Sequence, residues 1–491
     1  MRTLMSVAAA ALACVCAMGA AQAVTLSPKG FGQVLTFPYY TVNRSQSTLL
    51  SIVNVDPVNG KAFVVHFLEG YNGRQVSGLY VFLSPNDVWT ASVTQTSVDG
   101  AAQILTADHS CTSPLVTAAV PFTSAIYDGT GSMPADGGPT SVTRTREGSI
   151  EVIETGDIPP QTLLYEAIVH VQNGEPGGGV PACTSGVINP GSADLLPPTG
   201  GLMGSAAIVN VEQGIFFAYN ADALTGFTST ALNVPHAPTE LFPPDLSYAN
   251  SRSSSYAGGA MANLMSDGGD PLTLDYAHPI DAVSAVFMAD TLYNEYFVDA
   301  NLGAATDWIV TFPTKAFYVD PAINGGVAVA PFVESFGQTL DGESNVEYGA
   351  TITDREEAQA PDTDPFPPTS HPTGLAYQTN ALTFPASDPN IIVSAVFGSS
   401  LLSPFGPLSW PQAYGSTGWV RFGFAEGDGG LHVMRPDAAG RLLVGLPATG
   451  FMAYNLVNAN AQPGLLANYS GAFPHRSTFT CMESTDGLSC R

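Results

Sequence analysis

The sequence has few basic residues. Across 491 residues, 15 Lys and Arg face 42 Asp and Glu, so the formal net charge is −27, and only three of the basic residues are Lys. Nucleic acids and anionic membrane surfaces attract positive charge, so this balance argues against both as partners. Only 12% of the residues are charged while 45% are hydrophobic, a composition that excludes a disordered chain. The surface must be built largely from Ser, Thr, Asn, Gln and Gly.

A long apolar segment occurs only at the start of the sequence. Residues 1–23 combine one basic residue, a run of small apolar side chains and the cleavage site Ala21-Gln22-Ala23, which is the pattern of a secretory signal peptide. Cleavage before Cys14, as in a lipoprotein, is less favoured because the bulky aliphatic residue three positions earlier is missing. No later run reaches the roughly eighteen apolar residues that a membrane-spanning helix needs. We expect export to the periplasm, the outer surface or the extracellular medium, without a transmembrane helix.

Cysteine is scarce, and the four cysteines that follow the signal peptide are Cys111, Cys183, Cys481 and Cys490. An even number in an exported chain predicts disulfides, and four cysteines allow three pairings. We favour Cys111–Cys183 and Cys481–Cys490 because each pair is the nearer in sequence. In the chain-entropy model the long loop contributes about 4 kcal/mol and the short one about 3 kcal/mol. A zinc site built from all four is less favoured because no C-x2-C pair is present.

Familiar catalytic motifs are missing. The sequence has no G-x-S-x-G elbow, no H-E-x-x-H, no Walker loop and no G-x-G-x-x-G that opens a helix after a strand. No two of the eight histidines lie three or four residues apart, so no local pair suits a metal ion. His66 and His170 lie in apolar segments and are expected to be core or edge histidines. We assign no catalytic or cofactor-binding residue, and the sequence favours a non-enzymatic protein.

The most charged stretch, residues 143–157, offers the best candidate carboxylates. Glu151 or Glu154 could form half of a glycosidase pair. On a strand, however, these two side chains point to opposite faces. The alternative is an exposed strand on which these glutamates pair with Arg144, Arg146 or neighbouring strands, each pair contributing about 0–1 kcal/mol.

Calcium is the one cofactor that the composition suggests, because acidic clusters offer hard oxygen ligands. The candidate clusters are Asp267, Asp270 and Asp275, and Asp354, Glu356, Asp362 and Asp364. Neither fits the calcium loop D-x-[DN]-x-[DN]-G, so the alternative is two solvated acidic loops. The tryptophans are Trp89, Trp308, Trp410 and Trp419. They could form platforms on which sugars stack, or fill the core.

Strand-rich segments dominate the chain. The first five are residues 33–42, 47–55, 61–71, 78–84 and 87–95. Asn, Gly and Pro separate them, as turns require. Further strands are expected at 148–156, 163–171 and 306–319, and the best helical pattern covers 279–297.

This spacing predicts a mainly β fold made of antiparallel β-sandwich modules of the immunoglobulin-like sort, with one or two helices inserted in the C-terminal half. The predicted units are the signal peptide 1–23, an N-terminal β-sandwich 24–120, a second β module with long loops 121–235, a C-terminal β-rich domain 236–475 containing a helix near 280–297, and a disulfide-closed tail 476–491.

The letters L-P-x-T-G, which sortases read in Gram-positive wall proteins, occur at 196–200 and 446–450. Neither copy is followed by an apolar segment and a basic tail, so we expect neither to act as an anchor. Both instead read as Pro–Gly turns that launch a following strand.

Several segments together resemble a family of exported Gram-negative bacterial proteins to which no activity is assigned. They are "GQVLTFPYYTVN", "RTREGSIEVIE", "LYNEYFVDANLGAATDWIVTFPTKAFYVD" and "GLPATGF…NYSGAFPHR". The resemblance covers most of the mature chain and implies no site residues. The composition is also similar to that of bacterial surface-layer and other cell-surface proteins.

The leading functional hypothesis is an exported, non-enzymatic structural or adhesive protein of the cell surface or extracellular space. Its partners would be further copies of itself or other cell-surface components. Two alternatives remain open: a secreted or periplasmic carbohydrate-active hydrolase, and a small-ligand binding protein with an aromatic-lined cleft.

Overall fold

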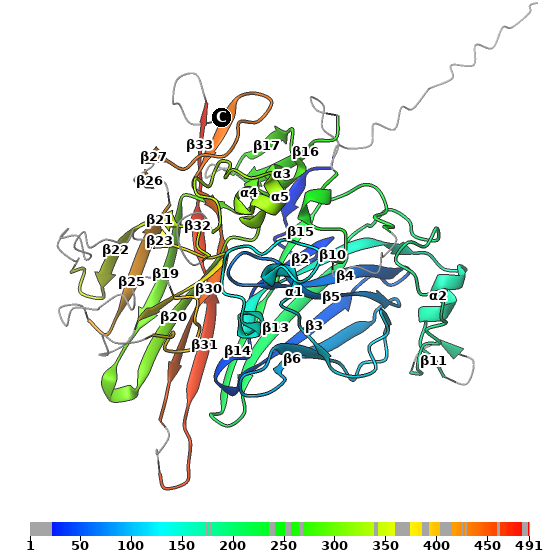
Figure 1. The fold of residues 1–491 in the computed structure, drawn as a ribbon, viewed down its shortest axis with the longest axis horizontal. Coiled ribbons are helices and arrows are strands. Elements are labelled where there is room, and N and C mark those ends of the chain that lie inside the picture. Colours follow the sequence, from blue (N-terminus) through cyan, green and yellow to red (C-terminus); the bar gives the residue numbers. More distant parts are fainter. Residues whose placement is uncertain are drawn as a thin grey trace, which may run out of the picture.

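The computed structural model describes residues 22–172, 175–176, 178–234, 241–250, 257–265, 269–337, 342–358, 374–384, 392–402, 415–424, 426–427, 430–458, 462–483 and 490. The fold is mainly β and consists of several antiparallel sheets (Figure 1). Strands of the first half (blue to cyan) lie to the right in Figure 1, and the sheets of the second half (yellow to red) lie to the left.

The first half is a sandwich of two large sheets. The nine-stranded sheet has the order β17 (Pro271–Tyr276), β16 (Ala260–Met265), β1 (Val24–Leu26), β15 (Asp222–Thr225), β2 (Val34–Thr41), β10 (Glu147–Ile158), β4 (Gly60–Glu69), β5 (Gln75–Leu83) and β8 (Cys111–Ser113). The six-stranded sheet has the order β14 (Ile215–Asn220), β13 (Leu202–Asn210), β3 (Ser47–Asn54), β6 (Val88–Gln95), β7 (Ala102–Leu105) and β9 (Val120–Pro121). Neighbouring strands are antiparallel, apart from the parallel pair β1 and β16.

Alternating side chains of the two sheets fill the space between them. Phe37 and Phe63 of the nine-stranded sheet and Ile52, Trp89 and Ile208 of the six-stranded sheet are all essentially unexposed and belong to one core cluster. Apolar residues spaced two apart on each strand produce this interior face. The opposite face of the nine-stranded sheet is also buried, so β4 and β10 are buried along their whole length.

The strand β10 lies between β2 and β4, so the sheet joins segments from both sides of residue 120. Strands β16 and β17 extend the same sheet from beyond residue 236.

The second half contains two four-stranded sheets. One has the order β22 (Gly349–Asp354), β25 (Thr417–Gly423), β19 (Thr291–Phe297) and β32 (Arg476–Thr478). The other has the order β24 (Thr379–Phe384), β20 (Ala304–Thr311), β30 (Thr449–Leu456) and β31 (Tyr469–Pro474). Trp308 is unexposed between them, with its ring centroid 5.7 Å from that of Phe384 and 6.3 Å from that of Phe422.

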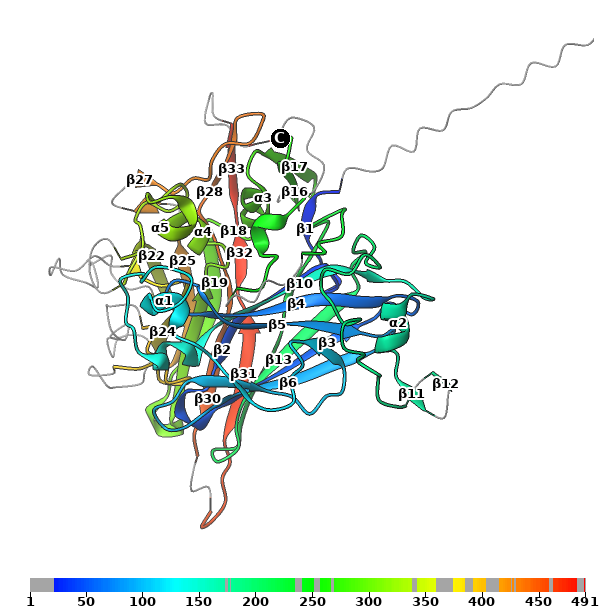
Figure 2. The ribbon, with the colours of Figure 1, turned by 45° about the vertical axis from the view of Figure 1, so that its right-hand side comes forward.

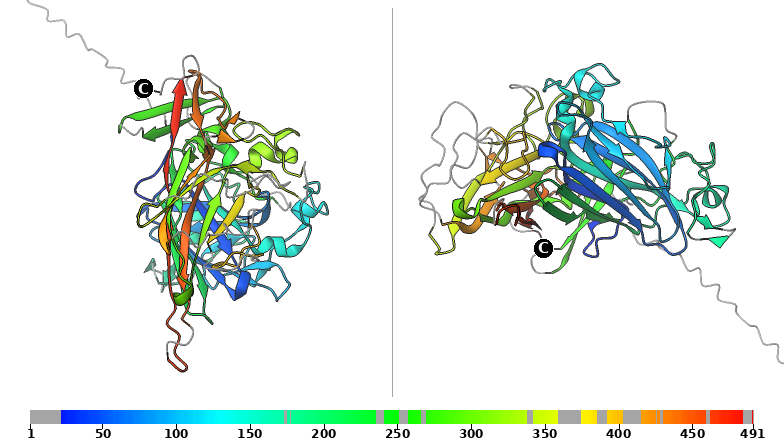
Figure 3. Two further views of the ribbon diagram at one scale, coloured as in Figure 1. Left: turned by 90° about the vertical axis from the view of Figure 1, so that its left-hand side faces the viewer. Right: turned by 90° about the horizontal axis from the view of Figure 1, so that it is seen from below.

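The second half packs onto the first through the other face of the sheet that contains β20 and β30. Ile309 and Phe451 join the core of the first sandwich, and Phe451 stacks on Tyr219 at 4.7 Å. The Thr311 hydroxyl donates a hydrogen bond to the Pro38 carbonyl, 2.6 Å away. Strands β4, β5 and β6 run across the view in Figure 2, whereas β19, β30 and β31 run nearly vertically. Seen from below in Figure 3, the two groups of strands lie side by side.

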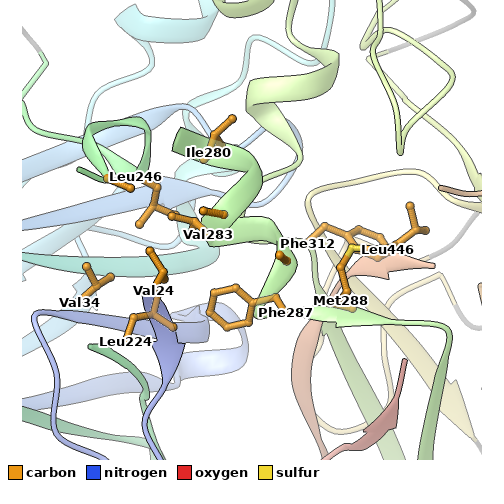
Figure 4. Close-up of a cluster of buried hydrophobic side chains, with 14 of the residues drawn as sticks. Val24, Val34, Leu224, Leu246, Ile280, Val283, Phe287, Met288, Phe312 and Leu446 are labelled. Atoms are coloured by element: carbon orange, nitrogen blue, oxygen red, sulfur yellow. The ribbon is translucent and has the colours of Figure 1, made fainter. Parts of the chain in front are cut away.

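Five short helices are present in the described part of the chain: α1 (Ala125–Asp128), α2 (Leu163–Ile168), α3 (Pro279–Ala285), α4 (Ala316–Val319) and α5 (Pro321–Asn324). Helix α3 seals one end of the nine-stranded sheet, and Figure 4 shows Val283 pointing toward Leu246. Pro279 stands at its first turn, where the missing N–H costs nothing.

Two-stranded ladders complete the structure. They are β11 (Val171–Gln172) with β12 (Glu175–Pro176), β18 (Met288–Ala289) with β29 (Leu446–Pro447), β21 (Val346–Glu347) with β23 (Gly374–Leu375), β26 (Glu426–Gly427) with β27 (Gly430–Leu431), and β28 (Arg441–Val444) with β33 (Thr480–Glu483). The predicted disulfides Cys111–Cys183 and Cys481–Cys490 are both present.

Three secondary-structure predictions are wrong in part. The helix expected at 279–297 ends at Ala285, and the chain continues as β18 and β19. The strand expected at 163–171 is mostly α2, because the Thr162 hydroxyl accepts a hydrogen bond from the Tyr165 N–H and caps a helix. The strand expected at 306–319 ends at Thr311 and is followed by α4.

Candidate functional site

The two glutamates singled out as glycosidase candidates do not form a pair. Glu151 lies opposite His66 in the sheet, with Oε2 3.6 Å from Nδ1, whereas Glu154 turns to the other face, with Oε1 3.1 Å from the Lys61 Nζ. Both carboxyls are buried, and burial raises the pKa of each. The strand is central in its sheet, so the expectation of an exposed strand at 143–157 is wrong.

Arg144, expected on that exposed strand, is instead buried in an ionic cluster that clamps the two halves together. Its guanidinium donates to Glu69 at 2.6 and 2.9 Å and to Asp136 at 2.5 and 3.0 Å. Beside it, Arg74 donates to both carboxylate oxygens of Asp320 at 2.8 and 3.0 Å. Since Arg74 follows β4 and Asp320 precedes α5, these contacts bridge the two halves. The cluster is buried and its charged side chains are paired with one another, which indicates a structural role.

The predicted calcium clusters are only partly described. Asp267, Asp362 and Asp364 lie outside the described residues, as does Trp410. The Asp354 side chain accepts hydrogen bonds from the backbone N–H groups of Glu356 and Ala358 and so shapes a turn. Among the residues that the structure describes, no three His, Cys, Asp or Glu side chains gather as a metal site would require.

The described histidines and tryptophans divide between core and surface. His66 is 2% exposed and its Nε2 lies 2.5 Å from the Phe242 carbonyl oxygen. His170 lies between α2 and β11, with its Nε2 3.2 Å from Asp87. Trp89 and Trp308 are core residues, whereas Trp419 is 41% exposed.

One buried amine, that of Lys315, has a pKa close to physiological pH. The Lys315 Nζ lies 2.6 Å from the Ser344 carbonyl and 3.1 Å from the Tyr377 carbonyl, between the rings of Phe312 and Phe332. Burial lowers the pKa of Lys315 to about 7. The amine bonds only to carbonyls of its own chain here, so it serves to tie loops together.

One groove, about 830 Å³, runs over the outer face of β3, β6, β13 and β14 toward β30. Small side chains dominate its lining, which also includes the carboxyl of Asp222. The Asp222 carboxyl accepts a hydrogen bond from the Thr449 hydroxyl, and burial raises its pKa. This groove therefore offers a smooth surface with few groups that could react with a ligand.

A second groove, about 700 Å³, is lined by aromatic side chains. We call it the aromatic groove, and its aromatic residues are Tyr296, Phe297, Trp419, Tyr454 and Phe473. It opens beside β19 because β32 pairs only with Thr291–Tyr293, which leaves the rest of that edge of β19 without a strand partner in the described sheet. Trp419 and Phe473 are 41% and 49% exposed, so ring surface is available to a ligand.

Polar groups border the aromatic groove. Glu295 lies directly opposite Trp419 on the neighbouring strand, and Arg355 lines the same groove. Arg355 forms a 2.7 Å ion pair with Glu356, and both side chains are well exposed. The Tyr454 and Phe473 rings are nearly parallel, with 9° between their planes and 6.2 Å between centroids. The groove thus combines flat apolar surface with charged groups at its rim.

Next to the groove, two arginines flank a tyrosine in a row across three strands. Tyr293 of β19 is paired with Arg421 of β25 on one side and with Arg476 of β32 on the other. Residues directly opposite in an antiparallel pair share a face, so the three side chains lie about 5 Å apart in a line. Both arginines are exposed, and neither forms an ion pair within the described residues. We call this set the arginine row.

The arginine row adjoins the groove through Tyr293, whose ring centroid lies 6.5 Å from that of Trp419. In Figure 1, β19, β25 and β22 stand on the left flank of the molecule. Sequence reasoning named Trp419 as a possible sugar platform but missed both arginines. Only the pairing of β25 and β32 with β19, which joins segments more than a hundred residues apart, brings these side chains together.

The fold and these surfaces define a mainly β protein with layered antiparallel sheets and an open groove lined by aromatic and charged side chains. A scan against protein-family models, a search of curated proteins and a search of solved structures found no match. Function is therefore argued from the site itself.

Proposed function

We propose that the protein is an exported, non-enzymatic adhesive protein of the cell surface or extracellular space that binds an acidic polysaccharide along the aromatic groove and the arginine row. The observation that carries this proposal is the exposed, unpaired arginine row beside an aromatic surface, in a chain whose net charge is −27. Exposed positive charge with no ionic partner among the described residues, on so acidic a protein, favours a ligand that supplies carboxylates.

The chemistry of the two surfaces is complementary to an acidic sugar. The apolar face of a pyranose ring packs on aromatic side chains, as Trp419 and Phe473 permit, while the hydroxyls bond to the polar rim. A guanidinium binds a carboxylate through two parallel hydrogen bonds. Arg421 and Arg476, about 10 Å apart across three strands, can contact carboxylates on successive sugar residues.

The same groove supports binding rather than hydrolysis. A glycosidase needs two carboxyls on either side of the scissile bond, about 5–9.5 Å apart. Glu295 is the only carboxylate among the described residues that line the groove. One carboxylate and several aromatic rings suit a surface that holds a chain without cutting it.

Export is supported by two observations. The signal-peptide pattern at residues 1–23 directs secretion. The disulfides Cys111–Cys183 and Cys481–Cys490 are bonds that persist in oxidising compartments. In the described part of the chain, no helix has the length and apolarity to cross a membrane.

Calorimetric titration with polygalacturonate, and with dextran as the neutral polymer, tests the ligand class. We expect binding of polygalacturonate that weakens with salt, and little binding of dextran. Trp419→Ala should weaken binding tenfold or more, which is about 1.4 kcal/mol. Arg421→Gln with Arg476→Gln should weaken it similarly and reduce the salt dependence.

The matched control is Lys29→Gln, which removes an exposed positive charge far along the chain from the groove. It should leave binding unchanged. Equal loss in the Lys29 variant, or equal binding of dextran and polygalacturonate, would contradict the proposal. Cell fractionation with surface protease tests the location, and a protein found wholly free in the periplasm would refute surface exposure.

A further inference from the structure

One lysine, one aspartate and one glutamate meet inside the first sandwich. Lys61 lies at the start of β4 and Asp157 near the end of β10, and the register places them directly opposite each other. The Lys61 Nζ is 2.5 Å from the Asp157 Oδ1 and 3.1 Å from the Glu154 Oε1. A second aspartate, Asp56, lies farther out, with Oδ2 3.4 Å from the amine.

An irregularity in β10 turns both acids toward the amine. On a regular strand, residues three apart such as Glu154 and Asp157 point to opposite faces. The pairing with β4 shifts between Glu154 and Gly156, so Thr155 is the extra residue of a bulge. The bulge changes the alternation, so the Glu154 and Asp157 carboxyls both lie within ion-pair distance of the Lys61 amine, at 3.1 and 2.5 Å.

The three groups are shielded from water. The side chains of Lys61 and Glu154 are unexposed, and that of Asp157 is 4% exposed. The loop before β13 closes over them: the Thr199 hydroxyl donates to Asp157 at 2.7 Å, and the Gly200 N–H donates to Glu154 at 2.9 Å. Each acid is therefore held in place by an element other than its own strand.

The protonation preferences of Glu154 and Lys61 bear on whether the amine can condense with an acid. Burial raises the pKa of Glu154 well above its usual range, which favours the protonated form that can act as an acid. Burial alone would lower the pKa of Lys61, but the neighbouring carboxyls outweigh it and raise the pKa, which favours the ammonium form of the amine. The neutral amine forms when the proton passes along the 2.5 Å contact to Asp157. Since that form is the minor one, reaction would be slow and would follow folding.

We propose that Lys61 and Asp157 become joined by an amide bond between the lysine Nζ and the aspartate Cγ, with Glu154 as the catalytic acid. The lone pair of the neutral amine attacks Cγ, while the Glu154 O–H donates its proton to the carbonyl oxygen. The C–O bond to the hydroxyl then breaks, the hydroxyl leaves as water with a proton from the nitrogen, and Glu154 takes its proton back from the carbonyl oxygen. One amine and one acid give one amide and one water, so no other reactant is needed.

The fold supplies what this step requires. Opposed side chains on paired strands hold the reacting atoms in contact, which replaces the entropy of a bimolecular encounter. The bond would close a loop of 96 residues and tie together two strands at the centre of the sheet. It would also remove a buried ammonium, which is costly to keep inside a protein.

Intact-mass spectrometry of the purified full chain tests the proposal. We expect the folded protein, after several days, to be about 18 Da lighter than its sequence once the hydrogens lost from the two disulfides are counted, because one water leaves. Digestion should yield a branched peptide that joins the segments containing Lys61 and Asp157. Full mass together with two unlinked peptides would overturn the inference, whatever the variants do.

Variants of Lys61, Asp157 and Glu154 test the role of each residue. Glu154→Gln keeps the size of the side chain but removes the acid, and we expect it to fold and keep its full mass. Lys61→Arg and Asp157→Ala should likewise keep full mass. The matched control is Glu151→Gln, on the same strand but the opposite face, which should still lose one water. Near-ultraviolet circular dichroism confirms folding, and a Glu154→Gln protein that still becomes lighter at the normal rate would refute the assigned catalyst.

Discussion

Replacing Arg144 by Met should be the most damaging single change in the first sandwich. The guanidinium is 4% exposed and donates to Glu69 and Asp136 through four hydrogen bonds. It also lies 4.3 Å from the centre of the Tyr127 ring. Met fills similar volume but removes the counter-ion of buried Glu69. Among the described residues it leaves Asp136 with only Arg74 as a counter-ion, 3.9 Å away. Breaking a buried ion pair typically costs about 3–5 kcal/mol.

The loss should lie within that range, about 4 kcal/mol, because part of the charge stays compensated. Glu69 still accepts backbone N–H groups from Tyr71, Asn72 and Arg74 at 2.8–3.0 Å. A loss of this size is a large part of the roughly 5–15 kcal/mol that stabilises a folded domain.

Urea unfolding followed by tryptophan fluorescence, with both disulfides intact, measures these differences. The control Arg421→Met removes an exposed arginine that makes no ion pair within the described residues, and it should change stability by no more than about 0.5 kcal/mol. A loss below about 1 kcal/mol for Arg144→Met would show that the cluster does not clamp the fold as argued.

Three further changes test other parts of the structure. In the folded state the pKa of Lys315 is depressed to about 7, so the unfolded chain binds more protons above that pH. The free energy of unfolding of the native sequence should therefore rise between pH 7 and 9, by up to about 1.4 kcal/mol per pH unit. Lys315→Met should not show this rise. Gly450→Ala should destabilise the second half by more than about 1 kcal/mol, because φ is +148° and the new Cβ would overlap the Ile309 carbonyl. In the control Gly464→Ala the new Cβ meets no atom, so the loss in the same denaturation assay should be smaller. Replacing the 111–183 disulfide by serines should lower the melting temperature more than replacing the 481–490 disulfide, since the loops span 72 and 9 residues.

Local sequence pattern predicted the strands of the first sandwich well. The sequence predicts a strand at 47–55, and β3 covers Ser47–Asn54 with alternating burial that places Leu50 and Ile52 inward. The pattern failed at 279–297, where apolar spacing fits a helix and a strand at once. The switch comes from tertiary pairing: Met288 pairs with Pro447, and Leu292 lies opposite Phe422, partners that only the folded chain provides.

The candidate sites were harder to predict than the strands, because the register between paired strands determines which side chains meet. Lys61 was noticed only as part of an apolar segment, although a lone lysine at the start of such a strand signals a buried partner. Its partner Asp157 faces it only because of the bulge at Thr155, which no local pattern announces. The arginine row depends in the same way on three strands that are distant in sequence.

The two L-P-x-T-G segments show how one short pattern can have a physical meaning unrelated to its spelling. In both, the Thr hydroxyl donates to a carboxyl, Thr199 to buried Asp157 and Thr449 to half-buried Asp222. In both, the following Gly has positive φ, +85° and +148°. Gly200 precedes β13, whereas Gly450 lies inside β30 opposite Val310, where a Cβ would overlap the Ile309 carbonyl. Proline removes a donor that would otherwise need a partner, threonine binds an acid, and glycine permits a backbone angle that other residues rarely adopt. The pattern can therefore recur in one chain without common ancestry or an anchoring role.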